Sequence, residues 1–432
     1  MTLLTTAERL AALMDHLGLA RAHVATQVAS DVAGFAAQYP QRIAGLVLCA
    51  PTRVDPAPFE QLAARLLMIS GDEGLTAEAA ERAQARLAAA RRHLLREYAA
   101  AAWSDVAADR AGEVAGAMTA FLTGFPADAA ALGGRSGSHA GLSFRIEGSG
   151  SPLILLPFFL APSQWDPALP ELTRRFTVIL IGGAHVGGVA ALEDRARAPS
   201  YQAMFRSLVD LMAPEPTSRI LDVGCGSGAL DRLLAERFAG ARIDAVDVNP
   251  FLLREAAALA ADFGNRIRFA PGSATALPFA DDTFDCVFSV TVLEECDAEK
   301  AIAEIKRVTR PGGRIGIVVR AIDLKQWWNP KLPPAIKAKA EVPPQSVAPA
   351  GVADASLYPR LARAGLADLV GFPALVTLDD PDGPIWRYRE DHVLSQLTAA
   401  ETEAWHAARA AAQAEGPLLQ AHPLHCAVGR KP

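Results

Sequence analysis

The chain has 432 residues, a hydrophobic fraction of 51%, a charged fraction of 21% and a formal net charge of −6 at pH 7. This length suits two or three domains, and the composition is that of a globular protein and excludes a disordered one. Because the balance is acidic and no basic run occurs, we expect no nucleic-acid partner.

The cysteines and the apolar runs indicate in which cellular compartment we expect this protein. The five cysteines are odd in number and form no Cys-x-x-Cys pair, so neither a metal site nor a disulfide framework is expected. The N-terminal segment lacks a basic stretch followed by an apolar run, and segments such as 152–160 are too short to cross a bilayer. We therefore expect a soluble, cytoplasmic protein. The sequence leaves a homo-oligomer open.

Residues 1–140 are rich in alanine and arginine. Their pattern predicts a helix over 75–95 and two buried strands, at 43–49 and 65–70. The small residues at 133–138 are typical of a flexible linker. Residues 141–195 then predict three strands and one helix, at 142–146, 152–156, 176–181 and 167–174.

Residues 196–432 begin with a predicted helix over 201–212 and then alternate strands and helices to the end, with inserts at about 322–355 and 376–420. Such alternation favours an α/β fold whose mainly parallel sheet carries helices on both faces.

A glycine-rich loop follows the first predicted strand of this third stretch. The apolar strand 219–223 leads into glycines at 224, 226 and 228, a helix over 230–238, and a second strand that closes with Asp247. Glycine lets the backbone turn tightly and approach a ligand, and the helix N-terminus beyond it suits an anionic group. An acid at the tip of the second strand can accept hydrogen bonds from both ribose hydroxyls. A turn with structural glycines and a dinucleotide-binding domain are the alternatives at this point.

Downstream blocks decide between these alternatives. A dehydrogenase has no reason to carry Leu-Pro-Phe at 277–279 or Pro-Gly-Gly at 311–313. With these blocks, residues 217–320 resemble a class I S-adenosylmethionine-dependent methyltransferase of the small-molecule group that includes the ubiquinone/menaquinone-biosynthesis enzymes. The resemblance implies a Rossmann-like, seven-stranded domain that binds S-adenosylmethionine and methylates a small-molecule acceptor. The five blocks that carry it are 220–228, 244–249, 272–279, 282–287 and 307–314.

The resemblance also implies roles for individual residues. Asp222 and the loop backbone would face the methionine end of the cofactor, Asp247 the ribose, and Ala274 and Leu277 the adenine. Ser273 stands where relatives usually have an acid, and its hydroxyl accepts the adenine amino group more weakly than a carboxylate would. The full set of implied cofactor-binding residues is Asp222, Gly224, Cys225, Gly226, Gly228, Asp247, Val248, Ser273, Ala274, Leu277, Val290 and Thr291.

Chemistry at the acceptor is less defined by the sequence. Glu294 and Glu295 follow the fourth strand, where they could act as a general base or hold a cationic substrate; the alternative is that both are solvated acids at a helix N-terminus. Aromatic residues among prolines in the two inserts suit a lid over the acceptor, or packing of the inserts against the sheet. His422 and His425, which precede a predicted last strand at 426–429, are expected to be structural.

The N-terminal part resembles an α/β-hydrolase in pieces. Residues 1–140 are similar to its second half and 141–195 to its first half, which suggests a circular permutation. Thr26 stands at the position of the nucleophile between Val24 and Val28, whereas a nucleophile elbow needs Gly-x-Ser-x-Gly. The acid position falls on Gly74 and the histidine position near Ser104, so we expect an inactive module.

Three hypotheses for the whole chain result. The first is a methyltransferase with an inactive hydrolase-like module. The second is a hydrolase with a regulatory methyltransferase-like domain, and the third is a non-catalytic module that binds S-adenosylmethionine.

Overall fold

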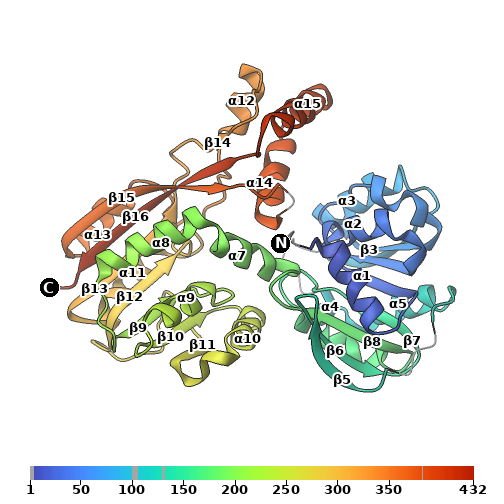
Figure 1. Ribbon diagram of the computed structural model, residues 1–432, viewed down its shortest axis with the longest axis horizontal. Coiled ribbons are helices and arrows are strands. Elements are labelled where there is room, and N and C mark those ends of the chain that lie inside the picture. Colours follow the sequence, from blue (N-terminus) through green and yellow to red (C-terminus); the bar gives the residue numbers. More distant parts are fainter. Residues whose placement is uncertain (1–3, 100–105, 129–131, 382) are drawn as a thin grey trace. The chain divides into compact units, whose positions relative to one another are not determined.

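The computed structural model describes residues 4–99, 106–128, 132–381 and 383–432, and the chain divides into two compact units, Met1–Ala190 and Ala191–Pro432. Figure 1 shows the helices and strands of each unit.

The first unit is built on one eight-stranded sheet. Strand β6 is antiparallel to both of its neighbours, β5 and β8, and the other strands run parallel. The order across the sheet is β4-β3-β2-β1-β7-β8-β6-β5, so the early strands form one half and the later strands the other. The strands are β1 Ala22–Thr26, β2 Ile43–Cys49, β3 Leu66–Glu73, β4 Arg91–Ala99, β5 Arg135–His139, β6 Leu142–Gly148, β7 Ser151–Leu155 and β8 Phe176–Gly182.

Helices cover both faces of this sheet, which explains the continuous apolar runs of its central strands. In β2, Leu46 and Leu48 join one core cluster, whereas Val47 and Cys49 join the other, because successive side chains point to opposite faces. The helical segments are α1 Thr6–His16, α2 Ala29–Gln38, η1 Pro40–Arg42, η2 Ala57–Arg65, α3 Gly74–Gln84, α4 Val106–Asp109, α5 Ala111–Leu122, η3 Pro162–Ala168 and α6 Leu169–Leu172.

Two predictions for this unit are wrong. The helix expected over 75–95 ends at Gln84, and 91–99 form the edge strand β4, where pairing with β3 and burial of Leu95 outweigh an alanine-rich helical pattern. The expected linker at 133–138 is largely strand β5. Ala140 and Gly141 both have positive φ, the geometry of a two-residue hairpin turn, and they join β5 to β6. The expected boundary at 140/141 therefore falls within this turn.

The second unit contains another eight-stranded sheet, with the order β11-β10-β9-β12-β13-β16-β14 and with β15 paired to β16. The first five of these strands are parallel, and β16 is antiparallel to its neighbours. The two-residue β14 adds an eighth strand to the seven expected. The strands are β9 Arg219–Val223, β10 Arg242–Asp247, β11 Ile267–Pro271, β12 Phe284–Val290, β13 Thr309–Arg320, β14 Trp327–Trp328, β15 Ala367–Leu378 and β16 Gln420–Arg430.

Helices pack on both faces of this sheet as well. Ile220 belongs to one core cluster and Leu221 to the other, so β9 is buried on both sides. Strand β16 begins at Gln420, so His422 and His425 lie within it and do not precede it as expected. The helical segments are α7 Gly187–Arg197, α8 Pro199–Met212, α9 Ala229–Arg237, α10 Pro250–Leu259, η4 Ala261–Arg266, α11 Ala298–Val308, α12 Pro334–Ala340, α13 Leu357–Arg363, α14 Pro384–Leu394 and α15 Ala399–Glu415.

The two inserts pack on each other through tryptophans. The Trp328 ring centroid lies 5.2 Å from those of Trp386 and Trp405, edge to face in both pairs. Both of the latter indoles donate to the carboxylate of Glu390, at 3.2 and 2.8 Å. These three aromatics therefore belong to a small core cluster that is separate from those on the two faces of the sheet.

The strand order reverses direction at β9. The chain proceeds from β9 to β10 and β11 on one side, and then returns to β12 on the other side of β9. In open parallel sheets, ligands bind beyond the carboxyl ends of the strands at such a switch point. The fold therefore directs attention to the loops that follow β9, β10 and β12.

Candidate cofactor site

The glycine loop lies at this switch point, between the end of β9 and the start of α9. Gly224, Gly226 and Gly228 have φ values of +86°, +54° and +70°, which disfavour any side chain. A Cβ on Gly224 would lie 2.2 Å from Cγ2 of Val292, which follows β12. The glycines therefore provide both the turn and the close approach of the two neighbouring loops.

Asp247 ends β10 and supports the loop. Its Oδ2 accepts from the Gly226 N–H and its Oδ1 from the Asn249 N–H, both at 2.9 Å. Each carboxylate oxygen has two acceptor positions, so both can still accept from a ligand. The adjacent Val248 is 72% exposed, which is high for an apolar residue.

Asp222, in β9, faces a second acid that sequence reasoning missed. Asp231, in the first turn of α9, is 0% exposed and lies close enough to Asp222 for the two carboxyl groups to affect each other's pKa. Neither Asp231 oxygen has a hydrogen-bond partner among the described residues. Burial raises the pKa of Asp231 to about 7, and burial and the charges of Asp231 and Asp247 raise the pKa of Asp222 well above its usual range.

The expected adenine-side residues lie beyond β11. Ser273 Oγ is 2.9 Å from Thr275 Oγ1 and accepts from the Thr275 N–H at 3.3 Å. Ala274 and Leu277 are buried, and the Leu277 N–H donates to Glu304 at 2.8 Å. The Ser273 hydroxyl is therefore engaged within its own loop.

Thr291 follows Val290 at the end of β12 and has a φ of +58°, unusual for a β-branched residue. Its hydroxyl donates to the Val290 carbonyl at 2.7 Å and accepts from Arg195 Nη1 at 3.2 Å. Cys225, in the glycine loop, is buried, and burial raises the pKa of its thiol well above the usual range. This thiol is therefore not a nucleophile at neutral pH.

Helix α7 contributes residues that the sequence did not single out. Glu193 accepts from the Ser227 hydroxyl at 2.7 Å and pairs with Arg232 at 2.6 Å, and Leu192 Cδ1 lies 3.0 Å from where a Cβ of Gly226 would be. This helix has no clear apolar stripe, so periodicity could not predict that it packs over the loop.

The two candidate general bases, Glu294 and Glu295, differ in burial and in their hydrogen-bond partners. Glu294 is fully buried, and its Oε1 accepts from the Arg320 N–H at 3.0 Å while Oε2 has no partner among the described residues. Burial raises the pKa of Glu294 to about 6. Glu295 is exposed and pairs with Arg320 at 3.3 Å. The alternative of a solvated acid therefore fits Glu295 and is wrong for Glu294.

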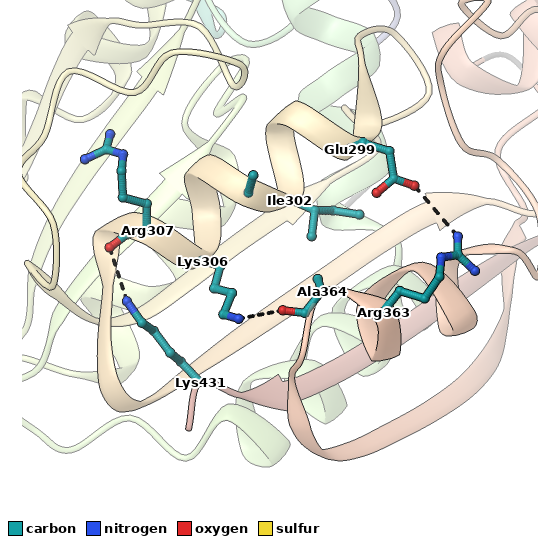
Figure 2. Close-up of a pocket in the computed structure, with 8 residues that line it drawn as sticks. Glu299, Ile302, Lys306, Arg307, Arg363, Ala364 and Lys431 are labelled. Carbon is teal, nitrogen blue, oxygen red and sulfur yellow. Dashed lines mark hydrogen bonds and ion pairs between the residues drawn. The ribbon is translucent and has the colours of Figure 1, made fainter.

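A separate cavity lies away from this edge of the sheet (Figure 2). Its basic groups are already bonded: Lys306 Nζ donates to the Ala364 carbonyl and Lys431 Nζ to the Asp282 carboxylate, both at 2.6 Å. Helix α11 ends here, where β13 begins, at the edge opposite the glycine loop. The cavity is lined by Glu299, Ile302, Ala303, Lys306, Arg307, Arg363, Ala364 and Lys431.

Among the described residues, no group of three or more His, Cys, Asp or Glu side chains could hold a metal ion. Within the same ranges, no helix has both the length and the apolar character that a membrane crossing needs.

Comparison with known proteins agrees with this geometry. Residues 221–317 match the family model described as a methyltransferase domain. An uncharacterised protein of Mycobacterium tuberculosis is 37% identical over 147 residues, 30% of this chain and 53% of that protein. The demethylmenaquinone methyltransferase of Thermus thermophilus is 39% identical over 114 residues, 26% of this chain and 52% of that enzyme. The chain thus spans about half the length of the curated relatives it matches.

Among solved structures, the YcgJ protein of Bacillus subtilis aligns with 53% of this chain and 98% of its own, at 19% identity and a TM-score of 0.38. From the family match and the named relatives, residues 221–317 are a class I methyltransferase domain that uses S-adenosylmethionine, as its five sequence blocks predicted.

Proposed function

We propose that the unit 191–432 transfers a methyl group from S-adenosylmethionine to a small-molecule acceptor. The bound cofactor supplies a methyl group already activated on a sulfonium. The protein therefore has to hold the cofactor, align a nucleophile and exclude water. The observation that carries the proposal is the pair Asp222 and Asp231, two buried carboxyls behind the glycine loop with no cation bonded to the Asp231 oxygens among the described residues.

A cationic group offered by the cofactor would compensate this pair, since opposite charge favours the ionised carboxylate. In this proposal Asp222 and Asp231 face the ammonium of the methionine moiety, and Asp247 accepts from the ribose hydroxyls. Val248 and Leu277 cover the two faces of the adenine. Cofactor binding would thus bury the exposed Val248 side chain.

The remaining implied residues keep their expected places as part of the proposal. The backbone of Gly224, Cys225, Gly226 and Gly228 borders the methionine end, Ser273 and Ala274 border the adenine, and Val290 and Thr291 lie under the sulfonium.

Glu294 is the proposed general base for a hydroxyl acceptor. A base whose pKa lies near the working pH transfers protons best, and about 6 meets that condition. Its free Oε2 is the atom that would take the proton. Glu295 instead positions Arg320.

Isothermal titration of the full-length protein with S-adenosylhomocysteine tests the cofactor site, and the absence of binding by a folded protein would contradict it. A metabolite extract supplied with methyl-labelled S-adenosylmethionine then separates an enzyme from a non-catalytic binding module. We expect label in a small-molecule product and release of S-adenosylhomocysteine. Cofactor binding with neither result would favour the binding module.

For the first unit we propose a permuted α/β-hydrolase-like scaffold without catalysis. Support comes from the sheet, whose two sequence halves form two spatial halves that meet where β1 pairs with β7. Thr26 ends β1 between Val24 and Val28, and its φ is not positive, whereas an elbow is a strained turn. Gly74 begins α3, and Ser104 lies outside the described residues. Turnover of a nitrophenyl ester that is lost in Thr26→Ala would instead support the hydrolase hypothesis.

A further inference from the structure

Several buried polar atoms gather beyond the carboxyl ends of β12 and β13. No described residue is a hydrogen-bond partner of Arg195 Nε, Tyr201 Oη, Arg389 Nε or His422 Nδ1. Each side chain comes from a different element, respectively α7, α8, α14 and β16. Buried polar atoms without partners are costly, and folded proteins usually satisfy such atoms with another polar group, ordered water or a ligand.

Contacts place these atoms at the edge of the sheet where the proposed methyl transfer takes place, beyond the carboxyl ends of the parallel strands. Arg195 Nη1 donates to Thr291 at the end of β12, and its guanidinium lies 5.1 Å from the Tyr201 ring centroid. Arg389 and His422 line a narrow cavity together with Arg320, which ends β13. Because β16 is antiparallel to β13, His422 lies at the same edge of the sheet as Arg320.

Within the described ranges, no carboxylate forms an ion pair with Arg195 or Arg389. Glu390, next to Arg389 on α14, bonds the indoles of Trp386 and Trp405 and pairs with Arg409 at 3.2 Å. The Oε1 atom of Glu294 is likewise engaged, with Arg320.

Arg389 is the most deeply buried cation of the cluster, at 6% exposure. Burial, together with the charges of Arg320 and Arg195, lowers the pKa of Arg389 to about 10, so the group still carries its charge at neutral pH. Burial also lowers the pKa of His422 well below its usual range, so this imidazole is neutral.

We propose that the methyl acceptor carries an oxyanion, a carboxylate or a phosphate, which Arg389 and Arg195 bind as an anchor beside Thr291. A planar guanidinium matches the oxygens of either group and forms short, charge-assisted hydrogen bonds with them. Tyr201 and His422 complete the hydrogen bonding, and the bound acceptor lies at the edge where Glu294 is the proposed base. This inference deepens the proposed methyl transfer and rests on it.

The test uses the full-length protein saturated with S-adenosylhomocysteine and three probes that share a phenyl ring: benzoate, phenyl phosphate and benzamide. Calorimetry at constant ionic strength should show one of the two anions binding about tenfold or more tightly than neutral benzamide. The tighter anion identifies the source of the oxyanion. Equal affinity for all three probes, or no anion binding, overturns the proposal.

Substitutions test whether Arg389 and Arg195 are the residues that bind the anion. Arg389→Met and Arg195→Met should each lose the preference for the anion, whereas Arg363→Met, the same change on α13, should keep it. Because Arg389→Met removes a buried charge without a partner, we expect its melting temperature to be no lower than that of the wild type. Unchanged anion affinity in both cluster variants overturns the proposal even if one of them folds poorly.

A second measurement needs no chosen probe. A metabolite extract is separated on an anion exchanger before methyl-labelled S-adenosylmethionine and enzyme are added. Acceptor activity is expected in the retained fraction, and acceptor activity confined to the flow-through overturns the inference. Failure of S-adenosylhomocysteine to bind the wild type would instead remove the proposed function itself.

Discussion

Replacing Asp231 by asparagine tests the buried carboxyl pair. Each pKa unit corresponds to about 1.4 kcal/mol, so moving this carboxyl from 3.8 to about 7 costs at most about 4 kcal/mol in the protein without ligand. The folded state holds the proton more tightly than the unfolded state does. The contribution of this carboxyl to the free energy of unfolding is therefore lost as the pH rises from about 4 through 7. Asp231→Asn keeps the shape and abolishes that loss.

We therefore expect Asp231→Asn without ligand to melt several degrees higher than the wild type at pH 8, with a smaller difference at pH 5. Differential scanning calorimetry of the whole chain measures this, and Asp262→Asn, an exposed acid, is the control. Ligand affinity should change in the opposite direction. The variant should bind S-adenosylhomocysteine about tenfold or more weakly than the wild type does, because one partner of the ammonium is gone. A lower melting temperature at pH 8 combined with unchanged affinity would refute the reasoning.

Three further changes probe neighbouring parts of the site. Asp247→Ala should weaken S-adenosylhomocysteine binding by roughly 1–3 kcal/mol in calorimetry, since the ribose hydroxyls lose a charged partner; unchanged affinity would count against its role. Gly224→Ala should cost roughly 1–3 kcal/mol of stability because its Cβ meets Val292, and adding Val292→Ala should restore part of the loss in thermal melts. No loss in the single variant would contradict this packing. Glu294→Gln should abolish a rise in kcat/KM with pH through about 6, measured with the acceptor fraction of the extract; an unchanged profile would exclude Glu294 as the base.

Prediction from the sequence was most successful where the residues of a feature follow one another closely in the chain. The loop 222–228 and Asp247 are each a local consequence of a strand that ends and a helix or turn that begins, so spacing alone predicted them. Prediction was least successful where a strand forms only because it pairs with another strand of the sheet. Strand β4 and strand β5 contain helix-like and linker-like sequences, and only their neighbours β3 and β6 make them strands.

The sequence by itself predicted the glycine loop between β9 and α9, and its five ordered blocks identified S-adenosylmethionine as the methyl donor. It could not show that Asp231, on the helix nine residues after Asp222, is buried beside it. Nor could it show that Arg195 and Arg389, almost two hundred residues apart, interact at one edge of the sheet. Those arrangements depend on burial and on partners from other elements, which exist only once the sheet has formed.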